Sequence, residues 1–179
     1  ALKDECCSPY SAFPDFTDEG ETSIEGFEEG SAQGWIVDDP YPADNVGWQV
    51  DPESPFKGQY ALYFGDPNTQ TYAATDANGN GQPSVATIWT PGFTIPAEEF
   101  RTQMLSFWLN MSTEYDGSDG PGEGEKYDRL TVYVERVVTG EKVAAWDSSA
   151  TGNTTDGAYE QIGVDLTAFG GEYVRIGFG

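Results

Sequence analysis

The stretches "LTVYVERVV" at residues 130–138 and "EYVRIGF" at residues 172–178 decide the fold class of this chain. Both alternate between apolar side chains and polar or small ones, the apolar ones being Leu130, Val132 and Val134 in the first and Val174, Ile176 and Phe178 in the second. This period of two is the pattern of a β-strand with one buried face. No turn or return strand follows the second stretch, so we expect it to be an edge strand, where an apolar edge invites pairing.

Short apolar segments separated by Gly, Pro, Asn and Asp continue this pattern along the chain. We expect strands near residues 33–37, 46–50, 59–64, 85–89, 103–111, 129–138, 142–146, 159–165 and 172–178. The segment "QMLSFWLNM" at 103–111 is apolar on both faces, which is typical of a central sandwich strand. No ten-residue segment has a helical period. The sequence predicts an all-β sandwich over residues 21–179, preceded by an extended arm over residues 1–20.

The charge of the chain is extreme. Its 179 residues contain 31 acidic and 8 basic side chains, which gives a net charge of −23 and a pI near 4.1. Such a surface repels nucleic acids and anionic membranes and attracts cations. No apolar run approaches the ~18 residues of a membrane helix. The alternative reading is a surface whose charge serves only solubility.

The composition argues against catalysis. The chain has no histidine, which removes Ser-His-Asp and Cys-His relays and histidine metal ligands. A carboxylate pair for glycoside hydrolysis stays open among 31 acids, but no stretch places one carboxyl in an apolar pocket. We therefore expect that the protein is not an enzyme.

Two acidic segments are candidate calcium sites, because calcium prefers several oxygen ligands on tight loops. In "DANGNG" at 76–81, Asp76, Asn78 and Asn80 alternate as in the first half of an EF-hand loop, although no helices flank it. An Asn-Gly hairpin turn explains the same residues equally well. The second segment, at residues 113–128, carries Asp116, Asp119, Glu123 and Asp128 in a Gly-rich loop. Its alternative reading is a solvated acidic loop.

The five tryptophans give a further functional hint. Exposed rings in a row would form a platform on which sugars stack. Trp108 and Trp146 lie within apolar strands, so we expect both in the core, where large rings are usually buried. Trp48 and Tyr63 are the better candidates for a glycan-binding surface.

Seven segments occur in an order that resembles bacterial MAM-like jelly rolls, the domains called "choice-of-anchor J". They are "FEEGSAQGWIVDD", "VGWQVD", "YALYFGD", "VATIWTPGFTIP", "LSFWLNMSTEYD", "YDRLTVYVE" and "YEQIGVDLTAFGGEYVRIGFG". The resemblance covers residues 24–179 and extends distantly to carbohydrate-binding jelly rolls. It implies a secreted or surface-attached, non-catalytic β-sandwich. It also implies a structural calcium near the "F-E-x-G" start, with Glu28 as a ligand.

One departure from the family leads to a functional hypothesis. Members usually continue after "VRIGF" into a final acidic strand beside the first one, and this sequence lacks that strand. We expect a jelly roll without its own closing strand. Either the chain is a fragment, or another copy fills the gap.

The N-terminal arm is the candidate donor strand for that gap. Tyr10, Ala12 and Phe16 offer apolar side chains at even spacing, and Cys6 and Cys7 could lock the junction between copies. Head-to-tail donation builds a filament. We therefore predict a secreted, calcium-binding structural or adhesion protein that assembles with itself through residues 1–20. The alternative is a carbohydrate-binding module of a secreted hydrolase.

Overall fold

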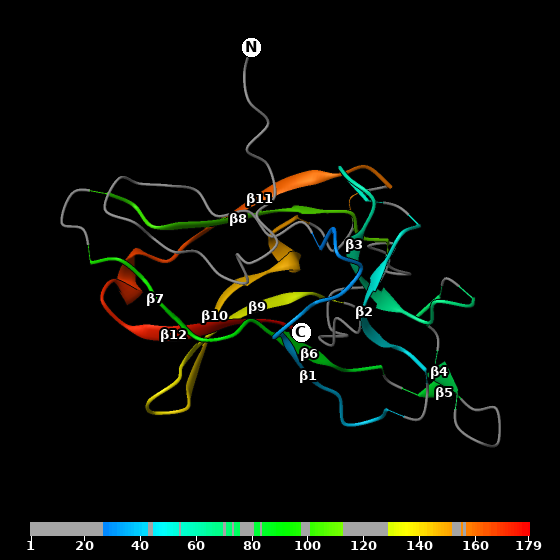
Figure 1. Ribbon diagram of the computed structural model, residues 1–179, viewed down its shortest axis with the longest axis horizontal. Helices are drawn as coiled ribbons and strands as arrows, with labels where there is room; N and C mark the ends of the chain where they lie inside the picture. The colour runs from blue at the N-terminus through cyan, green and yellow to red at the C-terminus, as the bar shows by residue number, and fades with distance from the viewer. Residues whose placement is uncertain are drawn as a thin grey trace, which may run out of the picture.

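The computed structural model describes residues 27–42, 45–53, 55–69, 71–72, 74–75, 81–82, 84–97, 101–112, 129–151, 155 and 157–179. Within these ranges the chain forms twelve β-strands and two short 3₁₀ turns. Two layers of sheet lie face to face, with a hairpin at one end (Figure 1). The predicted all-β sandwich is confirmed. Among the described residues, no helix has the length and apolar character needed to cross a bilayer.

The larger layer is a six-stranded antiparallel sheet in the order β1-β6-β12-β9-β10, with β7 also paired to β12. Its strands are β1 (Ile36–Asp38), β6 (Thr87–Trp89), β7 (Phe93–Thr94), β9 (Thr131–Arg136), β10 (Glu141–Asp147) and β12 (Tyr173–Phe178). The connection between β9 and β10 turns at Gly140, whose φ of 72° favours glycine.

The last strand, β12, is not an edge of this sheet, so that expectation is wrong. It pairs along one side with β9, from Val174 opposite Arg136 to Phe178 opposite Val132. Its other side is occupied by β6 at one end and β7 at the other. The order of strands in the sheet differs from their order in the chain, because residues 87–94, which come much earlier in the sequence, pair with the second side of β12. Among the strands that the structure describes, β1 and β10 form the edges of this sheet.

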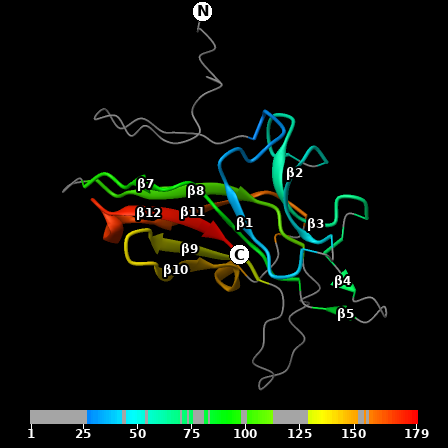
Figure 2. The same cartoon turned by 60° about the horizontal axis from the view of Figure 1, so that its bottom comes forward.

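The smaller layer is the antiparallel pair β8 (Met104–Leu109) and β11 (Glu160–Asp165). Figures 1 and 2 both show this pair lying over β12, β9 and β10. Burying apolar area between the two layers is the main favourable contribution to folding. The core consists of Ile95, Val132, Val134, Ile162, Val164, Leu166, Phe169, Val174 and Ile176.

Two hairpins and two turns complete the described fold. The strands β2 (Gly47–Asp51) and β3 (Ala61–Gly65) form one hairpin, and β4 (Ala74–Thr75) and β5 (Gly81–Gln82) form the other. Both lie to one side of the sandwich (Figure 2). The 3₁₀ turns are η1 (Ser148–Thr151), after β10, and η2 (Thr167–Phe169), between β11 and β12.

Candidate functional site

The β2–β3 hairpin carries both residues that the sequence offers for glycan binding. In its register Trp48 lies opposite Phe64, and Gln49 lies opposite Tyr63. Directly opposed residues share a face of a sheet, whereas neighbours along a strand point to opposite faces. Trp48 and Tyr63 therefore lie on opposite faces of the hairpin, and they do not form one platform.

Trp48 is half-buried, and its indole makes two contacts within the chain. Its Nε1 donates a hydrogen bond to the Ala86 carbonyl at 3.0 Å. Its ring is tilted against Phe64, with centroids 5.3 Å apart. The indole is thus fixed in one orientation, which lowers the entropic cost of using it as a wall of a binding site.

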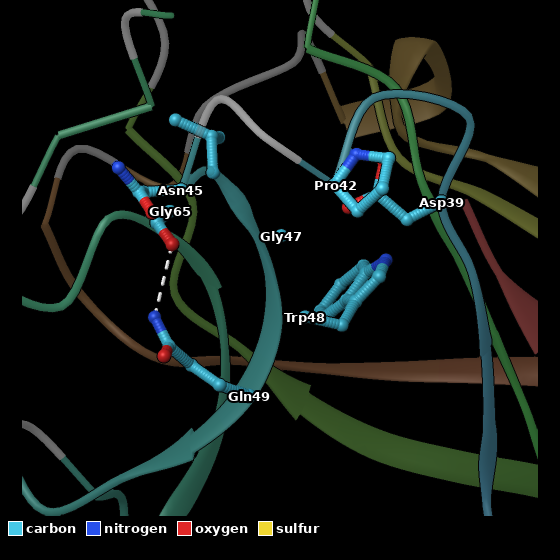
Figure 3. Close-up of a pocket in the computed structure, with 8 residues that line it drawn as sticks. Asp39, Pro42, Asn45, Gly47, Trp48, Gln49 and Gly65 are labelled. Atoms are coloured by element: carbon cyan, nitrogen blue, oxygen red, sulfur yellow. Dashed lines mark hydrogen bonds between the residues drawn. The ribbon is translucent and has the colours of Figure 1, made fainter.

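A pocket of about 160 Å³ lies beside this indole (Figure 3). Its lining consists of Asp39, Pro42, Asn45, Val46, Gly47, Trp48, Gln49 and Gly65. The volume is well below the ~300–1,000 Å³ of drug-sized sites, so the pocket would hold a small polar group or one unit of a larger ligand.

The polar groups of the pocket are partly committed to the protein. The Gln49 Nε2 donates to the Gly65 carbonyl at 2.9 Å, which leaves the amide oxygen as an acceptor. Asp39 Oδ1 accepts the Tyr41 backbone N–H at 2.7 Å. Gly47 makes room for this carboxylate, since a Cβ there would lie 3.3 Å from Asp39 Oδ2. One ring with a carboxylate and amide oxygens is a lining that suits hydroxyl-bearing neutral ligands.

On the other face, Tyr63 serves the hairpin itself. Partial burial raises the pKa of its phenol, and the neighbouring carboxylates of Asp51 and Asp66 raise that pKa further. The ring lies over Gly65, where an added Cβ would come within 2.3 Å of the hydroxyl. Tyr63 therefore stays neutral at pH 7 and packs on the backbone of its own strand.

Glu28, the predicted calcium ligand near the start of the sandwich, has a protein partner. Its two carboxylate oxygens accept the Gln59 backbone N–H at 3.2 and 2.9 Å. The carboxylate lies directly over Gly58, whose φ of 78° and missing Cβ permit this approach. Glu28 thus joins the first described segment to the residues just before β3, and its role as a calcium ligand stays a prediction. In the part of the chain that the structure describes, no three Asp, Glu, His or Cys side chains gather as a metal site.

The other predicted site residues fall outside the described ranges. They are Cys6, Cys7, Tyr10, Ala12 and Phe16 of the arm, Asp76, Asn78 and Asn80 of the first acidic loop, and Asp116, Asp119, Glu123 and Asp128 of the second. Their roles stay predictions.

Four of the eight basic residues lie on or beside β9, β10 and β12, and each pairs with a carboxylate. The pairs are Arg129–Asp147, Arg136–Glu141, Arg136–Glu172, Lys142–Glu135 and Arg175–Glu135. Lys142 and Arg175 also lie over the Trp89 ring, each 4.7 Å from its centroid. Half of the positive charges of the chain are thus paired with carboxylates on this sheet. These four side chains therefore do little to offset the negative potential of the rest of the surface.

Trp108 is placed differently from the prediction. It is 45% exposed, whereas the sequence places it in the core. It lies on the outer face of β8, where it stacks on Phe56 with centroids 4.0 Å apart. Ser106 lies two residues earlier on the same face, and this polar residue is the feature of the sequence that indicates a solvent-exposed face. Trp146 packs against the core, as predicted.

Comparisons with known proteins support the fold. No protein-family model and no curated protein matches the sequence. The K1 cleaved adhesin domain of Lys-gingipain from Porphyromonas gingivalis W83 is structurally similar, with a TM-score of 0.53 and 18% identity over 85% of this chain and 84% of that chain. The K3 cleaved adhesin domain of the same protein has a TM-score of 0.52 and 17% identity, covering 86% of each chain. These TM-scores show a shared fold. The choice-of-anchor J family stays a prediction.

Proposed function

We propose that this chain is a non-catalytic, extracellular adhesion domain of the bacterial cell surface that assembles with further copies of itself by strand addition. Its similarity in fold to two domains described as adhesins supports the adhesion role. The absence of histidine from the sequence supports a non-catalytic role.

The observation that carries the assembly proposal is the difference between the two edges of the large sheet. β10 has a register shift between Ala144 and Trp146 and begins with the charged pair Glu141-Lys142, features that protect an edge from pairing. β1 has neither a bulge nor a positive charge, and its Ile36 and Val37 are 56% and 45% exposed. Within the described residues, β6 is the only strand beside β1. Its outer edge is therefore the place where a further strand would add.

The proposed donor is the arm at residues 1–20 of another copy. β1 is three residues long and offers few main-chain hydrogen bonds. Side chains must therefore supply part of the affinity, and Tyr10, Ala12 and Phe16 have the required apolar character at even spacing. Cys6 and Cys7 precede them and would lock the junction by disulfide bonds between copies.

Calcium is part of the proposal because of charge. Copies that each carry a net charge of −23 repel one another. Divalent cations bound to the acidic loops at 76–80 and 116–128 would reduce this repulsion, with Asp76, Asn78, Asn80, Asp116, Asp119, Glu123 and Asp128 as the ligands. Glu28 stays a predicted additional ligand.

The test is light scattering on the purified chain, first with calcium and then with a chelator. We expect large particles with calcium that dissolve on chelation. Ile36→Lys should prevent growth, because a charge on an edge strand opposes pairing. Deleting residues 1–20 should prevent it too. The matched control is Val138→Lys in the β9–β10 turn, where the side chain is 86% exposed. Two results would contradict the proposal. One is that the wild-type chain stays monomeric with calcium, and the other is that the Ile36→Lys variant assembles as well as the wild type.

A second function, glycan binding, is favoured by the pocket at Trp48. Its fixed indole and the Asp39 carboxylate supply a stacking surface and hydrogen-bond acceptors, which match what a neutral sugar needs. A glycan array with the wild type and Asp39→Asn tests this function. Binding that the substitution weakens supports it, and an array without signal excludes it.

A further inference from the structure

The outer face of the β8–β11 pair carries exposed apolar side chains. In the register of this pair, Trp108 lies opposite Gln161, Ser106 opposite Gly163, and Met104 opposite Asp165. Leu105 and Phe107 point the other way and pack against the core. Met104, Ser106 and Trp108 therefore share the face that is turned away from the large sheet.

A ring from the β2–β3 hairpin joins this face. Phe56 stacks on Trp108 with centroids 4.0 Å apart and an interplanar angle of 19°. Tyr159, just before β11, is tilted against Phe56 at 5.3 Å. We call Phe56, Met104, Trp108 and Tyr159 the aromatic face.

Contacts among the described residues leave much of this face exposed. Side chains that serve only to anchor the hairpin on the sheet would be covered by that contact. Instead Phe56 stays 38% exposed, Trp108 45% and Met104 54%. Phe, Tyr, Trp and Met are the apolar residues that are enriched in protein–protein interfaces. Trp and Tyr are also the common residues at which binding energy concentrates.

Charge indicates the kind of protein that fits. The chain as a whole carries a net charge of −23, and Asp165 lies on the aromatic face itself. The pKa of this carboxyl is held below its usual range by the side chain and backbone N–H of Thr167, so it is charged at neutral pH. The Phe56 ring is already used within the chain, because Trp108 stacks on it and the Lys57 ammonium lies 5.7 Å from its centroid. The exposed side of the Trp108 indole is therefore the aromatic surface that a partner's cation would meet. The strongly negative net charge of the chain, the Asp165 carboxylate and the electron-rich indole all favour lysine and arginine side chains.

We propose that the aromatic face is a docking surface for a basic protein segment, whose lysine or arginine side chains lie on the exposed ring of Trp108 and beside Asp165. This surface is on the opposite layer from β1. It therefore does not depend on the self-assembly proposed above, and each proposal can fail without the other.

The experiment is a selection from a random peptide library on the full chain, with counter-selection on Trp108→Ala. We expect the surviving peptides to be rich in Lys and Arg. The most enriched peptide, made synthetically, should bind Trp108→Ala about tenfold or more weakly than wild type, as expected for a central interface ring. Its affinity should fall as salt is added, because the steering is electrostatic.

Two variants at Met104 that introduce opposite charges give an independent measurement, in which no aromatic ring is removed. Met104 is exposed, so Met104→Lys and Met104→Glu should both fold, and Val138→Lys is the control for adding a positive charge elsewhere. Met104→Lys should weaken peptide binding several-fold more than Met104→Glu, and Val138→Lys should leave it unchanged. Peptides without a basic excess, equal binding by the two Met104 variants, or no peptide surviving counter-selection would overturn the proposal. So would Trp108-dependent binding of a neutral glycan on an array.

Discussion

Replacing Gly177 by alanine tests how the central strand of the large sheet is packed. Gly177 lies on β12 directly opposite Trp89 on β6. A Cβ added there would lie 2.6 Å from Trp89 Cζ3, 2.7 Å from Cε3 and 2.8 Å from Cη2. Trp89 is only 2% exposed and has the cations of Lys142 and Arg175 at 4.7 Å from its ring centroid. The indole therefore has little room to move away from the new methyl group.

The expected size of the effect follows from two opposing contributions. Overpacking of this kind costs about 1–3 kcal/mol. Replacing glycine by alanine lowers the conformational entropy of the unfolded chain, which offsets ~0.4–1 kcal/mol of that cost. The net loss of about 1–2 kcal/mol should lower the Tm by about 2–8 °C for a domain of this size.

The matched control is Gly163→Ala on β11. There the nearest atom to an added Cβ is Met104 Cε at 3.2 Å, the free end of a flexible and exposed side chain. This substitution should leave the Tm unchanged or raise it slightly. Thermal unfolding followed by circular dichroism measures both variants. Equal shifts for the two, or a rise in Tm for Gly177→Ala, would show that Trp89 is not held as described.

Two further substitutions test the electrostatics. Glu135 is buried, and its two carboxylate oxygens accept hydrogen bonds from Arg175 Nη2 at 3.0 and 2.9 Å. Glu135→Gln should therefore lower the free energy of unfolding, measured in urea, by about 1–3 kcal/mol. An unchanged urea midpoint would contradict this expectation. Hydrogen bonds from the side chain and the backbone N–H of Thr167 lower the pKa of the folded Asp165 carboxyl. The stability that this carboxylate contributes is therefore complete above its unfolded pKa of about 3.9, and it is lost as the pH falls through the lower pKa of the folded state. Asp165→Asn should flatten the fall of Tm with pH below about 4, and parallel curves for the two proteins would argue against that.

Alternation along the strands made much of the fold predictable. Val132 and Val134 on β9 and Val174 and Ile176 on β12 are all buried, as their spacing predicts. The place of β12 within the sheet was not predictable in this way, because neighbours in a sheet are set by contacts between distant segments. The two-residue strands β4, β5 and β7 were missed because two residues show no period.

The exposed Trp108 shows a second limit of reading a sequence. Its strand is apolar on both faces, and this pattern does not distinguish a strand covered on two sides from one covered on a single side. The partner that covers part of it, Phe56, comes from a loop some fifty residues away, which no local pattern reveals. Glu28 shows the same limit, because its partner at Gln59 becomes visible only when the hairpin is folded.

Hydrogen exchange at the backbone amides of β1, Ile36–Asp38, tests the central claim of strand addition most directly. It would be measured on the chain with calcium and again after chelation. Because alternate amides of a strand point to opposite sides, those of β1 that face β6 are already hydrogen-bonded. Strand addition predicts that the β1 amides facing away from β6 become protected with calcium and return to faster exchange on chelation, while the amides of β10 are unchanged. Protection of β1 that is the same in both conditions, in a sample that light scattering shows to be assembled, would place the contact between copies elsewhere and contradict the account.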